Sequence, residues 1–311
     1  MMDRRIFFGG LAALAACADM RSSQKHQKRM AITMDDFDLR FDIGLGRKAR
    51  HENILGAFDA VGHKAAGFVT GDFADSDWGQ DVVQAWLDAG HVIANHTWTH
   101  PHAKDTDTAN YLADVTKNEA YLDKIPGTSV YFRFPFLDDG RDRTQQVELF
   151  AGLAEMDLRN APVTVDTIDW YATSRMEAAL KANPETDLEP YRDYYVNKCV
   201  TLAAHWDGVA QALGYKSLPH LTLMHHNVLN GHFLKDVLLA LKSDGWAFVD
   251  ASEALAFSEY HPIPHEPTSG RNWLTLKARE TKIEIEPYPE EYQGFGRKTM
   301  DALGLQAKTD L

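Results

Sequence analysis

Short apolar runs alternate with helical patterns along most of this chain, and this alternation constrains the fold more than any other feature. Between most of the runs, apolar residues recur every three or four positions, which is typical of a helix that packs one face on a sheet. Strands that alternate with helices form parallel sheets or barrels. The sequence therefore predicts a single α/β domain, a distorted (β/α)7-type barrel, whose strands fall at 30–34, 64–70, 91–95, 131–135, 161–166, 221–226 and 246–250.

Composition and charge limit the classes of partner. The chain has 311 residues, of which 44% are hydrophobic and 25% charged, as in ordinary soluble globular proteins. Its formal net charge is −13, whereas binding to nucleic-acid phosphates needs concentrated positive charge. We therefore expect no nucleic-acid partner. The two cysteines, Cys17 and Cys199, do not form a disulfide framework.

The first sixteen residues have the pattern of an export signal. Arg4 and Arg5 precede an apolar run over 6–16, which ends in small residues. This run is shorter than the ~20 apolar residues that span a bilayer. The first four residues of the pattern, Arg-Arg-Ile-Phe at 4–7, resemble a twin-arginine signal. We expect residues 1–16 to be a signal peptide.

The end of this signal resembles a bacterial lipobox. Residues 14–17 read Leu-Ala-Ala-Cys, after which Cys17 would carry a lipid and residues 17–29 would tether the domain. A plain cleaved signal with an incidental cysteine is the alternative. The lipobox predicts an exported protein, periplasmic or anchored to the envelope of a bacterium, that contacts the membrane only through the lipid.

Two further segments bear on domain organisation. The region 173–215 is longer than a simple crossover, and apolar residues in its second half repeat at helical spacing. Cys199 belongs to that apolar face, so we interpret it as a core residue and not as a nucleophile. Residues 258–311 are rich in Pro, Glu and polar residues without clear periodicity, so we expect a wrapping, partly irregular extension of a domain that covers 30–257.

Polar residues collect where the predicted strands end. In parallel α/β folds, functional sites lie at the carboxyl ends of the strands. Any one of these residues alone is better explained as a helix cap, a structural ion pair or a core histidine. Five strand ends with matching chemistry instead predict one basin that holds Asp35, Asp36, His96, His100, Arg133, Asp166, Asp169, Trp170, His225 and His226.

The histidine pair at 96 and 100 is a weak signal by itself. If the chain turned helical after Asn95, positions i and i+4 would share one face, and both rings would reach one metal ion. Trp98, between the two histidines, has no chemical role in this interpretation and is assigned to packing.

Five short motifs in order make the basin specific. The set resembles the polysaccharide deacetylases of carbohydrate esterase family 4, which include nodulation-type chitooligosaccharide deacetylases, over roughly residues 31–257. The motifs stand as Thr-Met-Asp-Asp at 33–36, His-Thr-Trp-Thr-His at 96–100, Arg-Phe-Pro-Phe at 133–136, Asp-Trp at 169–170 and Leu-Met-His at 223–225.

The resemblance implies a metal-dependent site. Asp36, His96 and His100 are carried over as ligands of a divalent metal, a set that leaves positions open for water and substrate. Zn²⁺ is the first choice, and cobalt, nickel or manganese fit the same ligands.

The resemblance also implies the proton-transfer groups. Asp35 is the expected general base and His225 the expected general acid. Arg133 would orient Asp35, and Asp169 would orient His225. The main-chain N–H of Phe136 would stabilise the oxyanion, and Trp170 would form an apolar wall.

The chain departs from the family pattern at several positions. Phe37 stands where Gly is usual, which we expect to reshape the mouth of the pocket, and Met34 replaces the usual Phe. His226 stands where the family often has Asp, which leaves it as an alternative acid and a candidate substrate-binding residue. The long segment after Asp169 is expected to cover part of an open sugar groove, which favours oligosaccharide over polymer.

The sequence thus predicts a hydrolase that removes N-acetyl or O-acetyl groups from an extracytoplasmic oligo- or polysaccharide. A hydrolase of small cyclic amides or ureides on the same fold is the first alternative. A non-catalytic carbohydrate-binding lipoprotein is the second.

Overall fold

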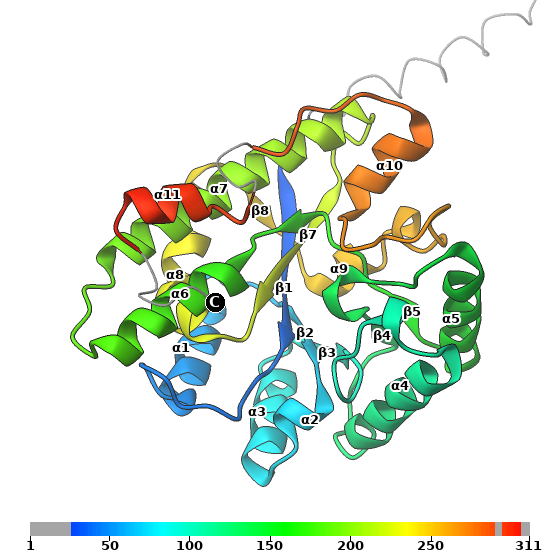
Figure 1. Cartoon of the computed structure of the whole chain (residues 1–311), viewed down its shortest axis with the longest axis horizontal. Coiled ribbons are helices and arrows are strands. Elements are labelled where there is room, and N and C mark those ends of the chain that lie inside the picture. The colour runs from blue at the N-terminus through cyan, green and yellow to red at the C-terminus, as the bar shows by residue number, and fades with distance from the viewer. Residues whose placement is uncertain (1–25, 290–293, 306–311) are drawn as a thin grey trace, which may run out of the picture.

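Strand β1, Arg29–Asp36, lies at the centre of a parallel sheet and ends in two of the predicted site residues (Figure 1). The computed structural model describes residues 26–289 and 294–305. The predicted signal peptide, Cys17 and most of the tether lie outside these residues. Among the described residues, no helix combines the length and the apolar character needed to cross a bilayer.

The sheet curls into a half-barrel of parallel strands. Seven strands follow the order β5-β4-β3-β2-β1-β7-β6, and β8 pairs with the start of β1. Six of the seven residues of β7 and six of the eight of β1 are buried, as expected for parallel strands that are covered on both faces. The strands after β1 are β2 Ala66–Val69, β3 Val92–Asn95, β4 Tyr131–Phe132, β5 Arg159–Asn160, β6 Val165–Asp166, β7 Pro219–His225 and β8 Ala247–Phe248.

Strand register brings the carboxyl ends of β1, β2, β3, β4 and β7 to one edge. Asp36 pairs with Val69, Val69 with Asn95, and Asn95 with Phe132. On the other side of β1, Asp35 pairs with His225. The expected basin at the ends of the strands therefore follows directly from the pairing.

Helices surround this sheet (Figure 1). Several helices begin with a side-chain N-cap. The side chains of Ser76, Asp107 and Asn227, for example, accept hydrogen bonds from N–H groups in the first turns of α3, α4 and α8. The helices are α1 Arg47–Val61, α2 Gly71–Ala74, α3 Asp77–Asp88, α4 Thr108–Leu122, α5 Arg143–Glu155, α6 Asp169–Ala182, α7 Glu189–Ala212, α8 Val228–Ser243, α9 Ala251–Leu255, α10 Trp273–Thr281 and α11 Arg297–Ala302.

The predicted strand at 161–166 was wrong in its extent. The N–H of Ala161 bonds to Phe132 on one side of the gap, and the N–H of Thr164 bonds to Leu221 on the other. Pro162, which has no N–H, lies between them and cannot extend a ladder. The chain therefore forms two short edge strands, β5 and β6, and the run between them spans the opening of the half-barrel.

The C-terminal extension is built into the domain. The N–H of Trp273, at the start of α10, donates to the carbonyl of Val163 in the barrel opening. Arg175 of α6 pairs with Asp301 of α11 at 2.6 Å. Figure 1 shows the segment crossing α7 between these two points. Residues 258–289 and 294–305 thus wrap over the edge of the sheet that carries the predicted site.

Cys199 lies on the inner face of α7 and is buried. Burial raises the pKa of its thiol to about 12, so the thiol stays protonated at neutral pH. The structure thus agrees with a core role for this residue.

Candidate metal centre and active site

Two imidazoles and one carboxylate converge at the ends of β1 and β3. Donor atoms of Asp36, His96 and His100 all lie within 4.8 Å of one another, and no other such group of three occurs in the described part of the chain. Asp36 Oδ1 lies 3.1 Å from His100 Nε2 and 3.5 Å from His96 Nε2. The three residues predicted as metal ligands are therefore brought together.

The histidines do not meet through a helix, contrary to the helical arrangement considered from the sequence. Residues 96–102 form an irregular loop in which Thr97 and His100 have left-handed backbone, with φ of 67° and 60°. The Asp114 carboxylate accepts hydrogen bonds from the N–H groups of Trp98 and Thr99 and thereby holds this loop. The loop, and not an i to i+4 helix face, sets the distance between the rings.

Trp98 has the packing role that the sequence suggested. Its ring lies edge-on to Tyr121 at 5.8 Å, and Lys117 lies over it at 4.1 Å. A Cβ at Gly71 would approach this indole to 2.4 Å, so only glycine fits there. The tryptophan thus anchors the histidine loop to α4.

Hydrogen bonding prepares His96 for a cation. Its Nδ1 lies 2.8 Å from the main-chain oxygen of Arg133. A carbonyl oxygen only accepts hydrogen bonds, so Nδ1 has to carry the proton that it donates. The proton is thereby placed on Nδ1 and the lone pair on Nε2, which faces Asp36.

The donor set fits a divalent metal. Asp36 Oδ1 is buried and accepts no hydrogen bond, as expected of a ligand atom. Burial alone would raise the pKa of Asp36, but the charges of the adjacent histidines hold it well below its usual range, so the carboxylate is ionised. Asp36 and Phe37 also adopt left-handed backbone, with φ of 75° and 56°, a strained conformation that turns the carboxylate toward the histidines.

Phe37 does not reshape the mouth of the pocket, as the sequence had suggested. Its ring is fully buried and packs edge-on against Trp86 at 4.9 Å. A Cβ at Gly67 would lie 2.5 Å from this ring. The phenylalanine that replaces the usual glycine therefore fills the core below β1 and β2.

Asp35 lies next to the three ligands and is held by an arginine. Its Oδ1 accepts a hydrogen bond from Arg133 Nη1 at 2.6 Å, and its Oδ2 lies 3.7 Å from His96 Nε2. Arg133 is fully buried, and it also donates to Thr33 Oγ1 and to the carbonyl of Ala161. One oxygen of Asp35 is thus fixed, and the other is directed at the cluster.

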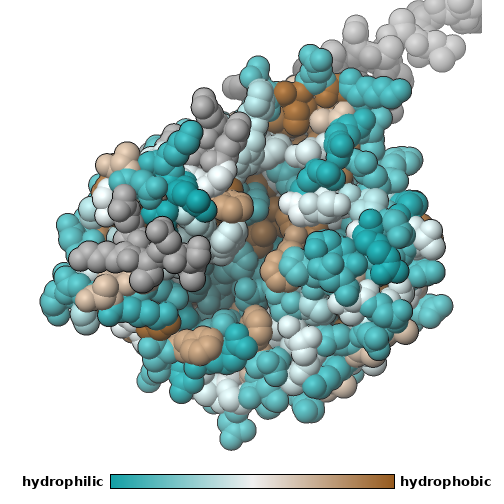
Figure 2. All heavy atoms as spheres, in the orientation of Figure 1, coloured by the Kyte–Doolittle hydropathy of each residue, from teal (hydrophilic) through white to brown (hydrophobic). Residues whose placement is uncertain are grey.

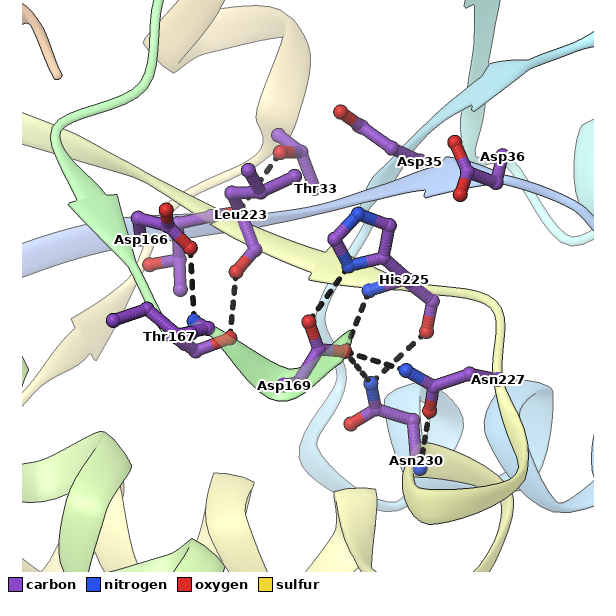
Figure 3. Close-up of polar contacts among 12 residues, drawn as sticks. Thr33, Asp35, Asp36, Asp166, Thr167, Asp169, Leu223, His225, Asn227 and Asn230 are labelled. Atoms are coloured by element: carbon purple, nitrogen blue, oxygen red, sulfur yellow. Dashed lines mark hydrogen bonds and ion pairs between the residues drawn. The ribbon is translucent and has the colours of Figure 1, made fainter. Parts of the chain in front are cut away.

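His225 and Asp169 form a second fixed pair on the other side of β1 (Figure 3). His225 Nδ1 lies 2.7 Å from Asp169 Oδ1. The other carboxylate oxygen accepts from the His225 main chain and from the amides of Asn227 and Asn230 at 2.7–2.8 Å. The two asparagines were not predicted, and nothing in the sequence indicated a contact with Asp169.

The pair leaves His225 protonated at neutral pH. Burial lowers the pKa of the imidazole, but the Asp169 carboxylate outweighs this effect and, with the nearby Asp36 and Asp35, raises it to about 10. Figure 3 shows the ring of His225 between Asp169 and Asp35, with its second nitrogen directed away from Asp169. The group can therefore hold a proton at Nε2.

His226, the alternative acid, occupies a different place. It is buried and stacks on Phe37 with ring centroids 4.9 Å apart, and burial lowers its pKa well below its usual range. It borders a neighbouring cavity and does not line the pocket over the metal ligands. A neutral, buried imidazole in this place cannot be the acid of the cluster.

Phe136 lies where the turn after β4 meets the cluster. Its backbone is left-handed, with φ of 59°, and the N–H groups of Leu137 and Asp138 bond back to residues 134 and 135. The Phe136 ring lies 4.4 Å from the His100 ring and stacks on His102. This turn thus places Phe136 beside one of the predicted metal ligands.

A pocket of ≈ 710 Å³ lies over these residues, and Figure 2 shows the hollow at the centre of this face. The predicted residues Asp35, Asp36, His96, His100, Phe136, Asp166, Trp170 and His225 all line it. From the long segment 173–215, Trp206 reaches the pocket. Most of the remaining wall comes from the C-terminal extension, which the sequence analysis did not place at the site because it lacks periodicity.

Comparison with known proteins agrees with this geometry. Residues 22–155 match the family model described as polysaccharide deacetylase. Over these residues the chain is similar to the polysaccharide deacetylases. The matched residues contain the first three of the five motifs, those at 33–36, 96–100 and 133–136.

The similar proteins have low sequence identity to this chain. A peptidoglycan-N-acetylglucosamine deacetylase of Bacillus cereus is 26% identical over 155 residues, which cover 49% of this chain and 50% of that protein. The chain thus spans about half the length of the curated relative. Among solved structures, a polysaccharide deacetylase from Bacillus cereus has a TM-score of 0.54 at 19% identity and covers 76% of this chain and 96% of its own.

One of the similar solved structures is described as a pseudoenzyme. A carbohydrate esterase family 4 pseudoenzyme from Bacillus anthracis has a TM-score of 0.51 at 16% identity and covers 74% of this chain and 66% of its own. At this identity the likeness shows the fold alone. It confirms the predicted (β/α)7 architecture, and activity has to be argued from the residues.

Proposed function

We propose that the chain is a metal-dependent hydrolase that releases acyl groups from the amide or ester of an acetylated saccharide outside the cytoplasm. The similarity of residues 22–155 to polysaccharide deacetylases, and of 155 residues to a peptidoglycan deacetylase, supports the saccharide substrate. The observation that carries the proposal is the geometry around β1. A base, a metal-ligand set and a protonated imidazole surround one pocket, each held by its own buried partners.

Asp36, His96 and His100 would hold the metal, with Zn²⁺ as the first choice. A bound divalent ion supplies Lewis acidity, which polarises the acyl carbonyl and lowers the pKa of water.

The chain's own residues move the protons. Asp35 accepts the proton of the attacking water at Oδ2, since Oδ1 is bonded to Arg133. Phe136 lines the pocket, and its main-chain N–H would donate to the oxyanion that develops on the carbonyl oxygen. His225 gives its proton from Nε2 to the leaving nitrogen or oxygen, and Asp169 stabilises the charged ring until then.

The N-terminal pattern supports export. The arginine pair, the apolar run and Cys17 lead us to propose a periplasmic or envelope-anchored bacterial lipoprotein, attached to the membrane by a lipid on Cys17. Labelling of the full chain with a fatty-acid analogue in a bacterial host tests this: wild type is labelled and Cys17→Ser is not.

A panel assay tests the enzymatic proposal. Acetate release is measured on chitooligosaccharides, peptidoglycan, acetylxylan and a cyclic amide, with Asp35→Asn as the matched variant. We expect release from saccharides by wild type and a loss of at least 100-fold in Asp35→Asn. If neither metal-loaded protein released acetate from any substrate, the result would favour a non-catalytic carbohydrate-binding protein. Turnover of the cyclic amide alone would favour the ureide-type hydrolase.

A further inference from the structure

The pocket over the metal ligands is far larger than an acetyl group requires. Its volume is ≈ 710 Å³, whereas an acetyl methyl group is about the size of a water molecule, whose share of liquid volume is ~30 Å³. A substrate that fills this pocket therefore has to place a larger group in it than the acetyl methyl.

The far wall of this pocket is apolar and comes from residues outside the five motifs. Ile285 and Phe295 of the C-terminal extension contribute to it, and Phe295 packs edge-on against Trp170 with ring centroids 4.9 Å apart. Phe136 and Leu137 border it next to His100. We call this space the apolar lobe; its remaining apolar members are Ile168, Trp206, Leu223, Pro287 and Tyr288.

Asn272 and Thr275, two polar residues that line the apolar lobe, are engaged with each other or with the main chain. Asn272 Oδ1 accepts from both the N–H and the hydroxyl of Thr275, and Asn272 Nδ2 donates to the carbonyl of Thr164. Arg271 Nη1 lies 3.3 Å from the carbonyl of Thr268. Arg271, Glu286 and Asp166 could bond to the hydroxyl groups of a second sugar ring, whereas the apolar wall of Ile285, Phe295 and Leu223 leaves such groups without partners.

A second cavity with the opposite chemistry adjoins the first. It has a volume of ≈ 380 Å³ and is bordered by Asp38, Arg50, Glu177 and Lys181. The exposed fraction of Arg50 is only 7%, and its buried Nε atom has no hydrogen-bond partner. Carboxylate and guanidinium groups around such a space suit sugar hydroxyls. We call it the polar lobe.

The two lobes meet at the catalytic residues. Asp36, Trp170 and His225 border both of them. The leaving nitrogen has to reach His225, which borders both lobes, while Phe136 and Leu137, next to His100, border the apolar lobe and not the polar lobe. A substrate whose sugar occupies the polar lobe therefore directs its acyl chain into the apolar lobe.

We propose that the preferred substrate is an N-acyl amino sugar whose acyl chain is longer than acetyl. The inference rests on the proposed hydrolase function. In the reaction, water adds to the acyl carbon, the amide C–N bond breaks, and the products are a fatty carboxylate and a free amino sugar whose nitrogen takes a proton.

A chain-length series tests the proposal. Release of the free amine is measured for N-acetyl-, N-butanoyl-, N-hexanoyl- and N-octanoyl-glucosamine with the metal-loaded enzyme. Each added methylene should raise kcat/KM by about two- to fourfold until the apolar lobe is full. Ile285→Asp should lower the ratio of octanoyl to acetyl kcat/KM by about tenfold. Ile263→Asp is the control, because Ile263 lies in the same extension and is 37% exposed, whereas Ile285 is half-buried, and Ile263 does not line the lobe.

A binding arm separates failure of this inference from failure of the proposed function. Calorimetry on Asp35→Asn measures the affinity for the same four ligands without turnover. Tighter binding and a more negative heat-capacity change with chain length support the apolar lobe as an acyl site, whatever the activity. Affinity and kcat/KM that are greatest for the acetyl compound, or tighter binding of chitooligosaccharides than of the octanoyl compound, overturn the inference but leave a deacetylase. Amine release from none of the compounds, combined with length-independent binding, overturns both.

Discussion

The Asp169 carboxylate lies 2.7 Å from Nδ1 of His225, and three further donors fix the same carboxylate in place. This contact converts an ordinary imidazole into one that stays protonated above neutral pH, with its pKa raised to about 10. The protonation of the proposed acid is thereby set by a partner from a different element, since Asp169 begins α6 and His225 ends β7.

The first prediction concerns the alkaline limb of the pH–rate profile. Because His225 has to be protonated to act as an acid, activity is lost as the pH rises through its pKa. Asp169→Asn removes the main group that raises this pKa, so the limb should move down by more than 1 pH unit. The profile of kcat/KM between pH 6 and 11 measures this shift.

Asp166→Asn is the matched control for that shift. Asp166 lies on β6 near the same pocket, and its carboxylate bonds to the N–H of Ile168 and not to His225. Its substitution should move the limb much less. An equal shift in both variants would show that general loss of negative charge, and not the Asp169 contact, sets the pKa.

The second prediction concerns metal affinity. His100→Ala removes one of three ligands and should weaken Zn²⁺ binding by at least 100-fold in calorimetry. His102→Ala is the control two residues away, because His102 pairs with Asp138 and stacks on Phe136 without joining the ligand cluster. Comparable losses in the two variants would argue against the assigned ligand set.

The third prediction concerns the buried ion pair of Arg133 and Asp35. Arg133→Met leaves a buried carboxylate without its partner, which should lower the free energy of unfolding by ~3–5 kcal/mol in urea titration. The double variant Arg133→Met/Asp35→Asn should recover part of that loss, since the uncompensated charge is gone. A double variant that is less stable by the full sum of the single effects would contradict the pairing.

The fourth prediction concerns acid stability. His63 Nε2 accepts the N–H of Ile32, and His91 Nδ1 accepts the N–H of Ala65, so both rings are neutral in the fold. Burial lowers the pKa of His63 to about 3 and that of His91 to about 4. Above pH 6.5 both rings are neutral in the folded and unfolded states. As the pH falls below 6.5 the unfolded chain binds protons first, so each ring should cost about 2 kcal/mol of stability by pH 5.

Urea unfolding at pH 7 and pH 5 checks this prediction. His91→Asn keeps an acceptor in the place of Nδ1 and removes the titration, so its stability should differ less between the two pH values than that of wild type. His265→Asn, at an exposed position, should behave as wild type. An unchanged pH dependence in His91→Asn would exclude His91 as a source of acid lability.

The fold and much of the site's composition could be predicted because they depend on local patterns. The run that ends in Asp35 and Asp36 and the run that ends in His225 are continuous buried strands, β1 and β7, whose pairing places Asp35 opposite His225. Once the sheet is parallel, its carboxyl ends have to meet. The five motifs lie on these ends.

What could not be predicted depends on long-range packing. The run at 161–166 has the pattern of one strand, yet it divides between two sheet edges because the half-barrel opens there. Asn230 holds Asp169 across 61 residues, and Ile285 reaches the pocket from an extension without periodicity. Such contacts leave no pattern in a single sequence.

Acyl release from an N-acyl glucosamine by metal-stripped protein, before and after the return of one equivalent of Zn²⁺, tests the central claim most directly. The account predicts negligible release without metal, restoration by Zn²⁺ in wild type, and no restoration in Asp36→Ala. Release that is unaffected by metal removal, or that Zn²⁺ restores equally in Asp36→Ala, would contradict it.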